Sequence, residues 1–261
     1  MNIIVCIKEV PETTEVKIDP KTNTLIRESV KGIINPFDMY AIEEGLRVKE
    51  RVGGKVTVLT MGPPQAEGSL REAISLGADE AVLISDRAFA GSDTWATSYT
   101  LTKGIEKLGS YDLIICGKQA IDGDTAQVGP GISVHLNIPL VSYVKKIEEV
   151  REGYLKLESM TEEGYEVIET NTPCLITVVK EINTPRLPSL KGKMRAKKQE
   201  IIKWKASDLN VRPENIGLNG SPTQVVRIFT PPQKAMGEIL TGDNGALTDR
   251  LVEVLKKAIV G

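Results

Sequence analysis

The feature that most constrains the fold is a regular alternation of short apolar runs with helical patterns through the first half of the chain. The apolar runs are expected as strands at residues 3–7, 56–60, 81–84 and 113–117. Helical periodicity follows each run, at about residues 38–51, 66–76, 94–108 and 125–136. Strands that are apolar throughout and separated by helices are typical of a parallel sheet covered on both faces. We therefore expect an α/β fold with a doubly wound parallel sheet.

The second half of the chain follows a different pattern. Four further strands are expected with no helix between them, at residues 140–144, 150–157, 165–168 and 175–179. These would be antiparallel strand additions or a small second sheet. A small hairpin is also expected around residues 17–18 and 25–26, inside the long loop 9–36.

The end of the chain favours a C-terminal helical extension. Apolar residues recur at helical spacing at Leu247, Leu251, Val254, Leu255, Ala258 and Ile259. A stretch rich in Gly and Pro precedes them and resembles a linker. We expect a main domain at residues 1–230 and an extension at 231–261, whose helix docks either on its own domain or on a partner subunit.

Charge and composition exclude several classes of protein. Lys and Arg number 33 against 35 Asp and Glu, giving a net charge of −2, and aromatic residues make up 4%. Binding to nucleic acid or to a membrane surface needs a basic excess, and base stacking needs aromatic side chains. No apolar run approaches the roughly 20 residues of a spanning helix, and the N-terminus lacks a signal-peptide pattern. We expect a cytoplasmic protein without membrane insertion.

Cysteine and histidine are too few for a metal or disulfide framework. Cys6, Cys116 and Cys174 lie far apart inside apolar runs, with no CxxC spacing. His135 is the one histidine, and no GxSxG serine accompanies it. We therefore expect no metal site and no catalytic residue, so a bound cofactor would carry any chemistry.

The loop after the fourth apolar run is the best candidate for a ligand site. Ligands of open parallel sheets bind at the carboxyl ends of the strands. Here Gly123 permits close backbone approach, and the next helix offers amides that can hold a phosphate. The spacing of Asp124 and Gln127 fits a capping box. However, no GxGxxG or P-loop pattern is present, and Asp122 and Asp124 would repel phosphate unless they turn away. An ordinary capped turn is the alternative.

Residues 117–127, GKQAIDGDTAQ, resemble the adenine-nucleotide loop of the β subunit of electron-transferring flavoproteins. Further matching segments occur in the same order at residues 5–8, 35–38, 60–63, 173–177 and 194–198. The resemblance extends from Met1 to about Lys205 and implies a Rossmann-like adenine-nucleotide-binding fold.

In that family the β subunit pairs with an α subunit that carries an electron-shuttling FAD. The β subunit holds AMP in ordinary members and a second FAD in electron-bifurcating members, where NADH is the hydride donor and ferredoxin an acceptor. This chain is most similar to the bifurcating group at residues 35–41 and 122–130. The small side chains of Gly123, Thr125 and Ala126 also leave room for a pyrophosphate. FAD is therefore the expected cofactor, with structural AMP as the alternative.

The resemblance also implies a set of binding residues. Cys6 would flank the adenine, Met61 would contact the ribose side, and Asn35, Phe37 and Asp38 would wall the nucleotide. The phosphates would be held by Gly117, Asp122, Gly123, Asp124, Thr125, Ala126, Gln127 and Val128.

The basic segment 183–200 matches the loop with which the family recognises a partner. Leu190 would be its apolar anchor for a flavin-containing dehydrogenase of the acyl-CoA or hydroxy-acid type, flanked by Lys191 and Lys193. A merely solvated charged face is the alternative.

From a different functional class, an adenine-nucleotide hydrolase on a similar sheet is disfavoured because the chain lacks a P-loop.

Overall fold

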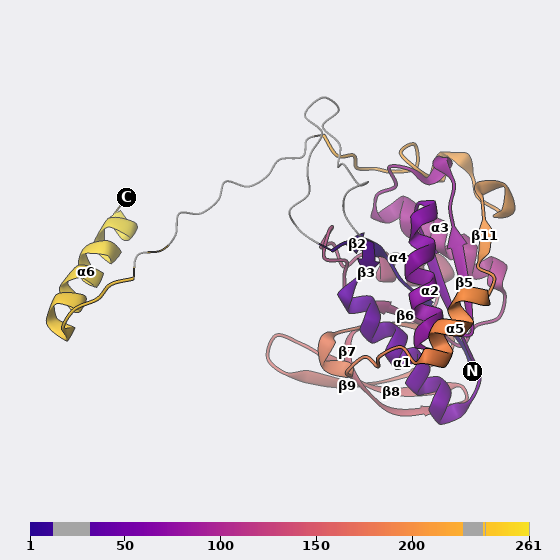
Figure 1. The fold of residues 1–261 in the computed structure, drawn as a ribbon, viewed down its shortest axis with the longest axis horizontal. Coiled ribbons are helices and arrows are strands. Elements are labelled where there is room, and N and C mark those ends of the chain that lie inside the picture. The colour runs from indigo at the N-terminus through magenta and orange to yellow at the C-terminus, as the bar shows by residue number, and fades with distance from the viewer. Residues whose placement is uncertain (13–31, 227–236, 238, 261) are drawn as a thin grey trace. The chain divides into compact units, whose positions relative to one another are not determined.

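The computed structural model describes residues 1–12, 32–226, 237 and 239–260 (Figure 1). The hairpin expected around residues 17–18 and 25–26 lies outside the described residues. Two compact units are present, Met1–Val226 and Arg227–Gly261, and each is described by itself.

Unit 1 is built on a nine-stranded sheet with the strand order β11-β5-β4-β1-β6-β10-β7-β8-β9. The strands are β1 (Asn2–Cys6), β4 (Lys55–Met61), β5 (Glu80–Ile84), β6 (Leu113–Gly117), β7 (Leu140–Arg151), β8 (Tyr154–Met160), β9 (Tyr165–Asn171), β10 (Cys174–Val178) and β11 (Ile202–Trp204). Every neighbouring pair from β11 to β7 is parallel, whereas β8 and β9 are added antiparallel. A separate antiparallel pair joins β2 (Glu9–Pro11) to β3 (Gly32–Ile34).

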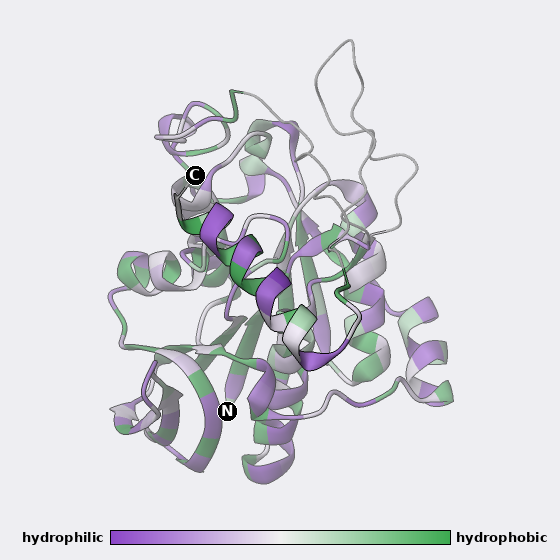
Figure 2. Ribbon diagram, turned by 90° about the vertical axis from the view of Figure 1, so that its left-hand side faces the viewer, coloured by the Kyte–Doolittle hydropathy of each residue, from purple (hydrophilic) through white to green (hydrophobic). Residues whose placement is uncertain are grey.

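Helices cover both faces of this sheet. They are α1 (Pro36–Val52), α2 (Glu67–Leu76), α3 (Thr94–Leu108), α4 (Val128–Leu136) and α5 (Leu190–Lys198). Alternate residues of β1 point to opposite faces: Val5 packs in the core beneath α1 and α2, while Ile4 packs in the core beneath α3 and α4. The strands are accordingly coloured as apolar between the helical layers in Figure 2. The predicted doubly wound α/β fold with antiparallel additions and a C-terminal helix is confirmed.

The structure corrects the expected order of the later strands. β10 is not part of an antiparallel extension but lies between β6 and β7, parallel to both. All five of its residues are buried, the pattern typical of a central parallel strand. The strand expected at 150–157 is instead a hairpin, because the chain turns at Gly153, whose φ of 75° is in the left-handed region, between β7 and β8.

Two helix starts also differ from expectation. α1 begins before residue 38, where the helix was expected to start: Asn35 is the N-cap residue and Pro36 opens the helix, which places Asp38 inside the first turn. α4 begins at Val128, three residues later than expected, because Asp124 and Ala126 adopt left-handed φ values of 54° and 53°. The capping box expected from Asp124 and Gln127 is therefore not formed.

Unit 2 contains α6 (Asn244–Val260), the helix expected at the end of the chain. Residues 231–236 and 238 of the expected linker lie outside the described residues. The division of the chain at residue 230 and the docking of α6 stay predictions.

Candidate functional site

The candidate site lies at the carboxyl ends of β1 and β6, where the sheet changes direction. From β1 the chain winds outward through β4 to β5, whereas β6 lies on the other side of β1. Cys6 and Cys116 face each other in register at the ends of these two strands. This is the switch point at which open α/β sheets bind ligands, and it is formed by the strand ends that the sequence singled out.

Gly117, at the end of β6, lets the first turn of α1 approach the sheet. A Cβ atom at this position would lie 2.3 Å from the Oδ1 atom of Asp38 and 2.7 Å from the carbonyl carbon of Phe37. Any side chain would push α1 away from the strand. The close packing of α1 against β6 thus accounts for a glycine at position 117 without any ligand.

Asp38 is a buried carboxyl group beneath this edge of the sheet. The residue is only 6% exposed, and its Oδ2 atom accepts a hydrogen bond of 2.7 Å from the backbone amide of Lys8. Burial raises the pKa of Asp38 to about 7 from an ordinary value near 3.8. Hydrogen bonds, including that from the Lys8 amide, lower the pKa less than burial raises it. Asp38 therefore supports the floor of the site and binds the end of β1.

Asn35 uses its side chain to fix the loop that follows β6. Its Nδ2 atom donates to the carbonyl of Gln119 at 2.8 Å, and its Oδ1 atom accepts from the amide of Ile121 at 3.1 Å. The backbone amide of Asn35 donates to the carbonyl of Lys8 at 2.8 Å. With an exposed fraction of 1%, Asn35 holds the loop in place from below.

The two loop carboxylates, which would repel phosphate if they were free, both have partners in the protein. Asp122 accepts a hydrogen bond of 2.7 Å from the ammonium of Lys8, and Asp124 accepts one from the side-chain amide of Gln119. The amide of Asp124 also donates to the carbonyl of Ala120 at 2.8 Å. These contacts turn the negative groups toward protein partners. The sequence did not indicate the role of Lys8, because its partner lies 114 residues away.

The start of α4 offers backbone amides to this loop. Gln127, the N-cap residue of α4, makes no side-chain cap hydrogen bond. Residues 122–125 are exposed, and a Cβ atom at Gly123 would meet nothing within 4 Å. An uncapped helix N-terminus with an open approach suits an anion such as a phosphate. The residues present therefore fit a nucleotide phosphate.

The remaining predicted nucleotide residues lie around the same edge. Met61 ends β4, the strand next to β1, and is half-buried, as is Phe37 in the first turn of α1. Cys6 is buried, and its thiol beside Cys116, together with burial, raises the pKa of the Cys116 thiol. The Cys116 thiol is thus a packing group rather than a nucleophile.

The predicted docking segment contains a helix that the sequence did not indicate. Leu190 opens α5 and is 78% exposed, and Leu187 and Met194 are exposed beside it. The side chain of Ser189 caps the helix by accepting from the amide of Gly192 at 2.9 Å. Lys191 and Lys193 are also exposed on α5.

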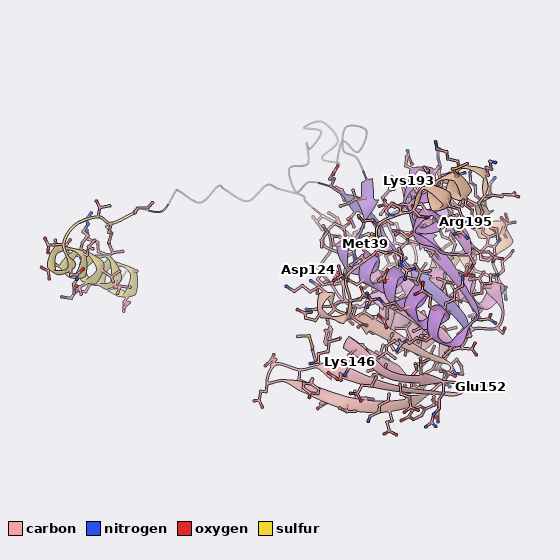
Figure 3. All side chains as sticks on the ribbon, turned by 60° about the horizontal axis from the view of Figure 1, so that its bottom comes forward. Met39, Asp124, Lys146, Glu152, Lys193 and Arg195 are labelled. Carbon is pink, nitrogen blue, oxygen red and sulfur yellow. The ribbon has the colours of Figure 1, made fainter. Side chains whose placement is uncertain are left out.

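Ion pairs between Arg186 and two glutamates hold this segment on α1. Arg186 donates to Glu43 at 2.8 Å through Nε and to Glu50 at 2.6 Å through a terminal nitrogen. Figure 3 shows Lys193 and Arg195 together on α5, apart from Asp124 in the loop after β6. The structure therefore presents the two predicted surfaces at separate places on unit 1.

Among the residues that the structure describes, no three His, Cys, Asp or Glu side chains are placed to hold a metal ion. None of the helices described is long and apolar enough to cross a membrane.

Comparison with known proteins agrees with this arrangement. The family model described as "Electron transfer flavoprotein domain" matches residues 22–209. The chain is 55% identical to the electron transfer flavoprotein subunit beta of Thermoanaerobacterium thermosaccharolyticum, over 98% of each chain. It is 52% identical to the caffeyl-CoA reductase–Etf complex subunit CarD of Acetobacterium woodii, over 97% of this chain and 98% of that one. Identity to protein FixA of Bradyrhizobium diazoefficiens is 47%, over 90% of this chain and 84% of the relative.

The matched segment includes β3, the loop after β6 and α5, so the comparisons cover both predicted surfaces. From the extent of this match and these identities, the chain belongs to the electron transfer flavoprotein family, as a β subunit.

Proposed function

We propose that this chain binds FAD at the carboxyl ends of β1 and β6, and that with its α subunit it oxidises NADH and divides the electrons between two acceptors. One acceptor is the α-subunit FAD, which passes electrons to a flavin-containing dehydrogenase, and the other is ferredoxin. The observation that carries the proposal is the uncapped start of α4 behind a loop whose carboxylates turn toward protein partners.

The chain's own residues would bind and orient the dinucleotide. The amides of Gly123 and of residues 125–128 would hold the pyrophosphate, and Gly123, Thr125 and Ala126 leave space beside it. Asn35 would keep the loop in position through its two hydrogen bonds. A flavin bound there supplies the hydride-accepting and one-electron-donating chemistry, for which the chain offers no acid–base pair of its own.

The relatives support the proposed partners. One relative is by name a subunit of a caffeyl-CoA reductase–Etf complex, which favours an acyl-CoA-type dehydrogenase as the partner of this chain. Leu190, Lys191 and Lys193 would dock that dehydrogenase, since an exposed apolar residue ringed by charges suits a transient interface. The apolar face of α6 would bind the α subunit.

The nucleotide content of the purified αβ heterodimer tests the proposal. Two FAD per heterodimer are expected. The same helix start would also accept the single phosphate of AMP, so one FAD with one AMP would replace the proposal by a non-bifurcating β subunit with structural AMP.

Steady-state assays of the complex test the division of electrons. NADH oxidation should reduce ferredoxin only while the dehydrogenase and its high-potential acceptor are turning over. Ferredoxin reduction without that acceptor would overturn the proposed coupling.

A further inference from the structure

The loop between β6 and α4 carries a negative charge at Asp122 that is offset by a residue far away in the sequence. Asp122 lies in the exposed loop before α4, where the proposed nucleotide brings at least two negative charges. A free carboxylate at this position would oppose the electrostatic attraction of the helix N-terminus for phosphate. The other loop carboxylate, Asp124, is engaged by the neutral side-chain amide of Gln119. This neutral partner leaves the charge of Asp124 in place, whereas the charge of Asp122 meets a cation.

Lys8 supplies this cation from a fixed backbone position just beyond the end of β1. Its amide donates to the buried carboxyl group of Asp38 at 2.7 Å, and its carbonyl accepts from the amide of Asn35 at 2.8 Å. With both backbone groups held, the side chain extends over the edge of the sheet. Its Nζ atom lies 2.7 Å from the Oδ1 atom of Asp122.

One of the two supports that fix Lys8 also shapes the loop. Asn35 bonds both to Lys8 and to the loop backbone at residues 119 and 121. The ammonium and the loop are thus positioned relative to each other by one buried side chain, unlike a typical surface ion pair between two flexible groups.

We propose that Lys8 determines the affinity of this site for phosphate by cancelling the charge of Asp122. The inference rests on the proposed function, in that it takes the loop to bind the phosphate group of an adenine nucleotide. The ion pair cancels one of the two carboxylate charges of the loop, so the amides of α4 act on the phosphate against less repulsion. Lys8 is a positioning and charge-compensating residue, and it takes no part in electron transfer.

Charge compensation gives the two single substitutions opposite effects. Lys8→Met leaves Asp122 uncompensated and should weaken nucleotide binding about fivefold, the scale of one partly exposed charge interaction. Asp122→Asn leaves a free ammonium beside the loop and should strengthen binding about two- to fivefold. The double variant should bind within about twofold of the wild type, because both charges are gone.

Salt dependence separates this effect from a loss of structure. Because exposed charges are screened by salt, the differences between the single variants and the wild type should shrink as ionic strength rises from 0.05 to about 0.5 M. A purely structural ion pair would make both single variants bind more weakly, with no reversal of sign.

The experiment uses the αβ heterodimer with its α-subunit FAD in place and the β-subunit nucleotide removed. Dissociation constants are measured by calorimetry with AMP and, separately, with FAD as the probe. Lys55→Met is the matched control, because Lys55 and Glu80 form an ion pair of 2.6 Å and similar exposure, 45% and 40% against 49% and 33% for Lys8 and Asp122. That pair lies at the amino ends of β4 and β5, and its loss should leave nucleotide binding unchanged.

Each outcome is decisive. Weaker binding in both single variants, or unchanged binding in Lys8→Met, overturns the role of Lys8. If AMP binds and FAD does not, the proposed FAD function fails while the AMP measurements still decide the role of Lys8. If the wild type binds neither probe, the site itself is wrong and the role of Lys8 falls with it.

Discussion

Replacing the buried Asp38 by Asn should remove a large pH dependence from the stability of the chain. Burial raises the pKa of Asp38 to about 7, whereas in the unfolded chain it is near its ordinary value of 3.8. Between these pH values the folded chain keeps the proton that the unfolded chain has lost. The folded state binds more protons, so stability falls as the pH rises from about 4 to about 7. A difference of about three pKa units corresponds to about 4 kcal/mol of unfolding free energy.

Urea unfolding of the wild type and of Asp38→Asn at several pH values between 4 and 8 tests this. Asn keeps the volume and an oxygen that can accept from the amide of Lys8. The variant should gain up to about 4 kcal/mol on the wild type as the pH rises through this window. Asp86→Asn is the control. Because the amide of Ala88 holds the pKa of Asp86 below its usual value, the stabilisation by Asp86 is lost only below about pH 4, so its difference from the wild type should stay constant between pH 4 and 8. A difference between Asp38→Asn and the wild type that stays constant from pH 4 to 8 would refute the reasoning.

Three further substitutions test the packing, the loop and the docking segment. Gly117→Ala should lower the free energy of unfolding by about 1–3 kcal/mol because the added Cβ atom meets the start of α1. Gly68→Ala, whose added Cβ atom would have no neighbour within 4 Å, should not lower it, and urea unfolding compares the two variants. Gly123→Val should leave the unfolding free energy within about 0.5 kcal/mol of the wild type but lower the nucleotide content of the heterodimer; full content would remove this loop from the binding site. Leu190→Ala should slow electron transfer to the dehydrogenase in stopped-flow measurements without changing nucleotide content, and an unchanged rate would contradict the anchor role.

The parts of the fold that the sequence predicted well are those whose signals are local. The helix expected at 94–108 is observed as α3 with the same bounds, and Asp93 caps it by accepting from the amides of Trp95 and Ala96. α2 ends at Leu76, the expected last residue, with Gly77 as its C-cap. Caps, glycine stops and apolar periodicity depend on residues within one or two turns, so they can be read without knowing the tertiary structure.

The parts that were wrong depend on contacts between distant residues. The late start of α4 follows a loop held by Asn35 and Lys8, which lie more than 80 residues earlier. The place of β10 in the sheet is likewise a matter of pairing order, although a run of four apolar residues and one threonine is a signal for a central strand that could have been used. α5 was missed because Pro and Lys dominate the composition around it, while its cap at Ser189 is a local signal that could have found it.

The sequence indicated where to expect the candidate site but not which side chains hold its loop in place. The sequence placed the ligand at the carboxyl ends of the strands and named Asn35 and Asp38 as walls of the nucleotide. In the structure both are buried, and their polar atoms bind the protein itself. Residue type and spacing cannot distinguish a side chain that contacts a ligand from one that holds the contacting loop, since both roles need the same hydrogen-bonding groups.

Helix α1 carries residues that hold both predicted surfaces in place, the loop after β6 and the docking segment before α5. At its start, Asn35 and Asp38 fix the loop and the end of β1; two to four turns later, Glu43 and Glu50 hold Arg186 and with it the approach to α5. Because a helix rises about 1.5 Å per residue, Asp38 and Glu50 lie about 18 Å apart along its axis. Core packing of Ala41, Ile42 and Leu46 against the sheet keeps α1 from shifting. Under the proposed function, this rigid element would set the distance between a dehydrogenase docked on Leu190 and a nucleotide at the end of β6, as electron transfer between fixed centres requires.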